Sequence, residues 1–112
     1  MMKMVLLNLI GLFLESPMLT KYGFDIDLEA NVQRLTNQLW KLIPMRENDE
    51  NWKGHLDSVI VEIAGLYEIF YTNPKFITLL AKLEGLTYEG ITFELHRKTV
   101  FESISLLREV LQ

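Results

Sequence analysis

The stretch from Asn51 to Tyr71, NWKGHLDSVIVEIAGLYEIFY, constrains the fold of this chain more than any other part of the sequence. Its apolar residues recur at intervals of three and four, which places them on one stripe of an α-helix and fits no β-strand. They are Trp52, Leu56, Val59, Ile60, Ile63, Leu66, Tyr67 and Phe70. Val61, Ala64 and Ile69 widen this apolar surface beyond what one neighbouring helix covers. We therefore predict a central helix near residues 51–71 that packs against several others.

Two helices are expected before the central one. Residues 3–15 are apolar on almost every side, so a helix there must be covered over most of its surface. The next helix is expected to begin after Asp27, whose side chain is a suitable N-cap, and to run to Ile43, where Pro44 ends it. Residues 45–50 are the most polar in the chain and are expected to form a loop or a fraying first turn.

Two more helices are expected after the central one. Asn73 and Pro74 are typical of a helix start, and Gly85 is suited to end that helix in a left-handed conformation. Thr92 is a candidate cap for a last helix from Phe93 to about residue 111. The sequence thus predicts an all-α fold, a compact bundle of about five helices forming a single domain over residues 1–112.

The first fourteen residues allow more than one interpretation. A lysine followed by MVLLNLIGLFL resembles the start of a signal peptide, but the run ends in Glu15, Ser16 and Pro17 instead of small residues at a cleavage site. The run is also about half as long as a membrane-spanning helix. We interpret it as a buried core helix, with an interfacial or partner-binding segment as the alternative.

Composition excludes several classes of function. The chain has 112 residues and no cysteine, so disulfides and thiolate chemistry are absent, and a cytoplasmic location is expected. A net charge of −4 removes the broad positive field that nonspecific nucleic-acid binding requires. We therefore expect neither nucleic acid nor a membrane as the partner.

The two histidines do not form a metal site by sequence pattern. His55 is preceded at i−3 by Trp52 and His96 by Phe93, so the Glu-x-x-His pairs of metal-binding bundles are missing. Ser58 lies one helical turn from His55, and we interpret this pair as solvated instead of catalytic. The run from His96 to Lys98 is likewise interpreted as a solvated face. We predict no metal, no cofactor and no enzymatic activity.

Glycines and aromatic residues leave two questions open. Gly54 and the pair Ala64-Gly65 indicate either a close helix crossing or glycines that face solvent. The aromatic residues are expected mostly in the core, although Trp40 lies at the edge of its stripe, where exposed tryptophans favour interfaces.

The excess of apolar helix surface predicts a protein–protein interaction function, as an accessory subunit, adaptor or inhibitor that forms a homodimer. The candidate partner interface comprises Leu7, Ile10, Leu14, Trp40 and Trp52.

Two alternatives remain. One is a small ligand-binding or enzymatic bundle with a pocket near His55 and Tyr67, which would be favoured if His55 and His96 converged. The other is a membrane-surface protein anchored by residues 1–14.

Overall fold

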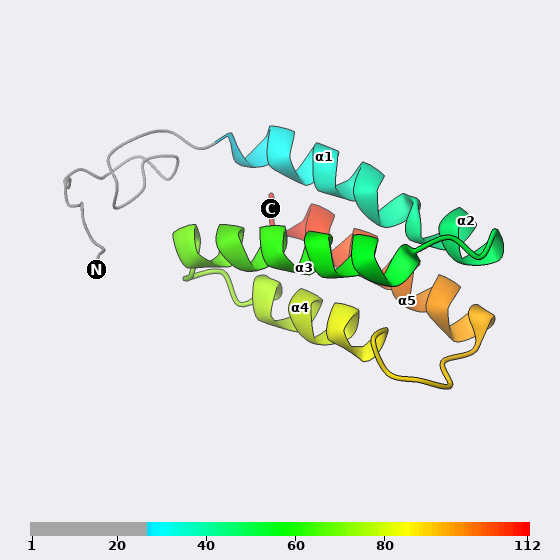
Figure 1. The fold of residues 1–112 in the computed structure, drawn as a ribbon. Coiled ribbons are helices and arrows are strands. Elements are labelled where there is room, and N and C mark those ends of the chain that lie inside the picture. The colour runs from blue at the N-terminus through cyan, green and yellow to red at the C-terminus, as the bar shows by residue number, and fades with distance from the viewer. Residues whose placement is uncertain (1–26) are drawn as a thin grey trace. The chain divides into compact units, whose positions relative to one another are not determined.

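The computed structural model describes residues 27–112, and these contain five α-helices and no β-strand (Figure 1). The chain divides into two units, Met1–Asn31 and Val32–Gln112. The helix predicted at residues 3–15 lies outside the described residues. At the first described residue, Asp27 Oδ1 accepts a hydrogen bond from the Ala30 N–H at 3.0 Å. This bond confirms Asp27 as the cap of α1 (Leu28–Trp40). None of the described helices is long and apolar enough to cross a membrane.

The predicted central helix is confirmed as α3 (Trp52–Ile69), which packs against α2 (Leu42–Glu47) and α4 (Lys75–Gly85). On another side, Glu62 of α3 forms an ion pair with Arg34 of α1 at 2.5 Å. Figure 1 shows α3 running between α1 and α4. The neighbouring helices do not cover the whole apolar surface of α3, because Val61 is 71% exposed.

The helix expected to run to Ile43 instead breaks after Trp40, and Pro44 explains the position of the break. A proline has no N–H to donate to the carbonyl four residues earlier, and its ring clashes with that carbonyl, which here belongs to Trp40. The chain therefore turns at Lys41 and starts a new short helix, α2. Pro44 lies in the first turn of α2, where its missing N–H costs nothing.

Residues 45–50 are not a loop throughout, because the first three of them, Met45–Glu47, continue α2. The helix then ends in a Schellman motif. The Glu50 N–H donates to the Met45 carbonyl at 2.8 Å, and the Asp49 N–H donates to the Arg46 carbonyl at 3.1 Å. Asp49 takes the left-handed conformation, with φ of 57°. Aspartate adopts this conformation more readily than most non-glycine residues. This helix can therefore end without a glycine.

Side-chain hydrogen bonds lie at three predicted helix starts, of which the one before α4 is shifted by one residue, because Pro74 and not Asn73 is the residue that precedes this helix. Asn51 Oδ1 accepts from the Gly54 N–H at 3.1 Å at the start of α3. Asn73 Oδ1 accepts from the Lys75 N–H at 3.0 Å before α4. Thr92 Oγ1 accepts from the Leu95 N–H at 3.1 Å before α5 (Phe93–Glu109).

The predicted helix end at Gly85 is wrong in one respect. Gly85 is the last residue of α4, and the cap that follows it, Leu86, has right-handed helical dihedrals of −76° and −13°. Two hydrogen bonds of the i to i−3 type, from Leu86 to Leu83 and from Thr87 to Glu84, close this end without a left-handed residue. Among the described glycines, Gly90 in the loop between α4 and α5 is the one with a positive φ, 84°.

The core of the second unit is mostly aliphatic and comes from all five helices. Its fully buried large residues include Leu35, Leu39, Leu42, Leu56, Ile63, Phe76, Leu79, Leu83, Leu86 and Leu107. α4 packs against both α3 and α5, and α2 also packs against α5. The expectation that the aromatic residues lie mostly in the core is wrong, because Phe76 is the one fully buried Phe, Tyr or Trp among the described residues, and Tyr71 and Tyr88 are the most exposed.

The small residues of α3 do not mark a close helix crossing. A Cβ atom at Gly65 would meet nothing within 4 Å, so this glycine faces solvent. A Cβ atom at Gly54 would lie 2.6 Å from Asn51 Nδ2, the side chain that caps the helix. Gly54 therefore leaves room for the cap and not for a neighbouring helix.

Candidate interaction surface

Trp40, a predicted interface residue, ends α1 with its side chain partly in solvent, at 39% exposure. Its indole ring contacts the ring of Phe101 on α5 edge to face, with centroids 5.1 Å apart. Phe101 is itself 37% exposed. Edge-to-face pairs stabilise both rings beyond the area they bury, so this aromatic pair is fixed in place while part of it faces solvent.

The exposed side of α5 continues the apolar surface away from Trp40. Leu95 is 47% exposed and lines an open groove of about 650 Å³ together with Lys98 and Phe101. The guanidinium of Arg97 lies over the Phe101 ring, 5.0 Å from its centroid, which is a cation–π contact. Two carboxylates, Glu94 and Glu102, also line the groove.

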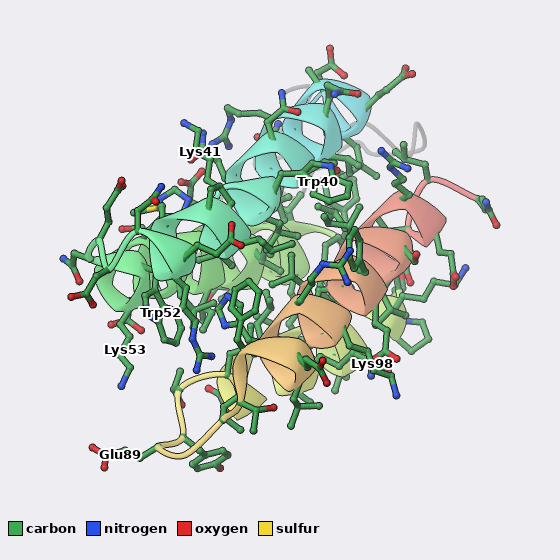
Figure 2. The ribbon with its side chains drawn as sticks, turned by 90° about the vertical axis from the view of Figure 1, so that its right-hand side faces the viewer. Trp40, Lys41, Trp52, Lys53, Glu89 and Lys98 are labelled. Atoms are coloured by element: carbon green, nitrogen blue, oxygen red, sulfur yellow. The ribbon has the colours of Figure 1, made fainter. Side chains whose placement is uncertain are left out.

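We call Trp40, Leu95, Arg97, Lys98 and Phe101 the α1–α5 surface. Figure 2 shows Trp40 between α1 and α5, and Lys98 further along α5. Three partly exposed large apolar side chains lie here beside two cations, which matches the composition of protein interfaces, rich in aromatic residues and arginine.

Trp52, the other described member of the predicted interface, lies elsewhere. It is half-buried at the first turn of α3, and its ring contacts His96 edge to face, with centroids 4.7 Å apart. Leu7, Ile10 and Leu14 lie outside the described residues. Of the predicted interface, the structure thus places Trp40 alone on the α1–α5 surface.

His96 was expected on a solvated face, and the structure contradicts this, because the residue is fully buried. Its Nε2 lies 2.9 Å from the Leu42 carbonyl oxygen, so Nε2 carries the proton and donates it. Nδ1 is buried with no hydrogen-bond partner. Burial lowers the pKa of His96, and the nearby Arg46 charge lowers it further, whereas the bond to Leu42 acts in the opposite direction.

The two histidines do not converge on a common cavity. His55 Nε2 lies 2.8 Å from the Gln38 carbonyl oxygen near the end of α1, and His96 contacts α2 instead. Tyr67 packs against Phe76, with ring centroids 6.3 Å apart. None of these residues lines the α5 groove. Within residues 27–112, no three histidine or acidic side chains gather as they would to hold a metal ion.

The α5 residues of this surface were not predicted from the sequence, because the segment around them was interpreted from its charged residues alone. In the run His96-Arg97-Lys98 the expectation of a solvated face is correct for the two cations, which are exposed, and incorrect for the histidine. The available signal was spacing. Arg97 and Phe101 are four residues apart, so they lie on the same side of a helix.

No protein-family model matches this chain, and searches of curated proteins and of solved structures find no match either.

Proposed function

We propose that this chain is a protein-binding helical protein whose α1–α5 surface docks onto the same surface of a second copy. The observation that supports the proposal is the aromatic pair of Trp40 and Phe101, held edge to face and partly exposed beside Leu95. Residues of this type, at the centre of an interface, supply most of its binding energy.

A second copy is favoured because the groove carries both signs of charge. Arg97 and Lys98 lie beside Glu94, and a two-fold axis brings each residue of one copy opposite a different residue of the other. Glu94 of one copy can then face the cations of its mate without new complementary residues. Glu102 is already paired, because its carboxylate accepts from Lys82 Nζ at 2.9 Å.

The alternative of a ligand-binding or enzymatic bundle near His55 and Tyr67 receives less support. His55 and His96 each donate to a backbone carbonyl, and they act as links between helices. The interface role of Leu7, Ile10 and Leu14 and the membrane anchor at residues 1–14 stay predictions.

The test is the absolute mass of the full chain by light scattering on a size-exclusion column, over a wide dilution range. We expect a dimer that dissociates on dilution, and a monomer for Leu95→Glu, because the interface would bury the added charge at an apolar position. Leu95 is nearly half exposed, so the substitution leaves the core intact. Tyr71→Glu is the matched control, since Tyr71 is exposed in the turn after α3 and should leave the dimer unchanged.

Two results would count against the proposal. A wild-type chain that stays monomeric at every concentration would exclude the second copy. A Leu95→Glu variant that remains as dimeric as Tyr71→Glu would place the interface elsewhere, and substituting Leu7, Ile10 and Leu14 together by glutamine would then test the N-terminal candidate.

A further inference from the structure

Two cations from different helices lie over one aromatic ring on another part of the bundle. The guanidinium carbon of Arg46 on α2 is 5.3 Å from the centroid of the Trp52 ring, and Lys53 Nζ on α3 is 5.7 Å from it. Each contact is a cation–π interaction. They bring two like charges close to the same ring, which is unfavourable unless solvent or an anion screens them.

The same three side chains line an open cavity of about 280 Å³ together with residues 88–91. These residues form the loop between α4 and α5, in which Gly90 has its positive φ and Tyr88 is exposed. The volume is close to the lower end of the range found for small-molecule pockets.

Arg46 is held in a fixed position at this cavity. Its Nη2 donates to the Ile91 carbonyl and its Nη1 lies 3.5 Å from the Thr92 carbonyl oxygen. These contacts anchor the guanidinium to the loop and leave its charge in place, because carbonyl oxygens are neutral. A fixed guanidinium loses little freedom when it binds a carboxylate or a phosphate.

Neither cation has a carboxylate partner within the described part of the chain. The ion pairs found there join Arg34 to Glu62, Lys75 to Glu109 and Lys82 to Glu102. Glu89 lines the cavity but comes within 4.0 Å of neither cation. In Figure 2 Glu89 lies at the outer end of the loop, and its carboxylate points away from Trp52.

We propose that this cavity binds a small organic anion. Its carboxylate or phosphate group lies between the Arg46 guanidinium and the Lys53 ammonium, and an aromatic or apolar remainder contacts Trp52 and Tyr88. The negative group supplies the charge that the cavity lacks, and the indole ring favours a flat ligand. This site is separate from the α1–α5 surface, so it does not depend on the proposed dimer.

The test uses Trp52 as the reporter, in the full chain carrying Trp40→Phe so that Trp52 is the one remaining tryptophan. Benzoate and phenyl phosphate are titrated, with benzamide as the neutral match for benzoate. We expect saturable changes in fluorescence for the two anions and none for benzamide. The anion that binds more tightly identifies a carboxylate or a phosphate as the natural group.

Substitutions then locate the site. Lys53 is exposed and its replacement leaves the core unchanged, so Lys53→Gln should weaken binding about five- to tenfold. Arg108→Gln removes an exposed cation from the last turn of α5, outside both proposed sites, and should leave the affinity unchanged. Arg46→Lys keeps the charge but loses the two-carbonyl anchor, and circular dichroism shows whether that variant is folded.

Three results would overturn the proposal. They are the absence of saturable binding by either anion, equal binding of benzamide and benzoate, and an affinity that Lys53→Gln reduces no more than Arg108→Gln does.

Discussion

Acidification should destabilise this protein through His96 before its carboxylates titrate. Burial lowers the pKa of His96 in the folded chain, whereas in the unfolded chain it is near 6.5. The unfolded state therefore binds the proton more readily than the folded state. The stabilisation is fully present above about pH 6.5 and is lost as the pH falls from there towards the lowered folded pKa.

The structure gives a physical reason for the unfavourable protonation. A proton added to Nδ1 would find no acceptor, because that nitrogen is buried without a partner. It would also place a second positive charge near Arg46, between the rings of Trp52 and Phe93. One proton changes the free energy of unfolding by about 1.4 kcal/mol per pH unit, a large part of a stability of about 5–15 kcal/mol.

The assay is urea denaturation followed by circular dichroism, at steps from about pH 8 to about pH 5, the range in which histidines titrate and most carboxylates do not. We expect the free energy of unfolding to fall below about pH 6.5, with a slope of at most about 1.4 kcal/mol per pH unit. In His96→Gln the slope should be absent, although the lost ring packing lowers stability at every pH by about 1–3 kcal/mol.

His55→Gln is the matched control, because the chain has two histidines and His55 also contacts a backbone carbonyl. The slope should persist in this variant. A wild-type stability that stays constant from about pH 7 to about pH 5, or the same slope in wild type and His96→Gln, would refute the reasoning.

The remaining predictions concern backbone and capping. Gly65→Ala should raise the free energy of unfolding by about 1 kcal/mol, because Gly65 lies inside α3 with open space at its Cβ position. Gly90→Ala should lower it by about 1–2 kcal/mol, since its φ is 84°. If both substitutions shift the urea midpoint in the same direction, this account of the two glycines is wrong. Thr92→Ala should cost about 1 kcal/mol through the lost cap of α5, and Thr92→Ser, which keeps the hydroxyl, should cost less. Equal losses in these two variants would show that the cap hydrogen bond contributes little.

Local signals predicted most of the helix starts, because they depend on neighbours in sequence. Asp27 and Thr92 cap the helices that follow them, as expected from residue type alone. The end of α1 was misplaced by three residues because a proline acts on the carbonyl four residues before it. A residue with left-handed dihedrals was expected at Gly85, at the end of α4. Among the described residues, the helix end with such a residue is that of α2, at Asp49.

The candidate sites were harder to predict, because they join residues far apart in sequence. Trp40 was recognised as an edge residue, but its contact with Phe101 depends on how α1 meets α5. The ring of Trp52 is shared by Arg46, Lys53 and His96, which come from three helices, and no spacing in the sequence relates them.

The sequence by itself determined that the regular structure within residues 27–112 is helical, and which stripe of each long helix is apolar, because both follow from a period of 3.6 residues and from local caps. The tertiary structure decided which polar side chains are buried and which apolar ones remain exposed. His96 is buried because α5 packs against α2, where the Leu42 carbonyl accepts a hydrogen bond from its Nε2. Val61 and Leu95 stay exposed because no described helix covers them. Burial depends on the partners that surround a helix, and these are fixed by the packing of distant segments.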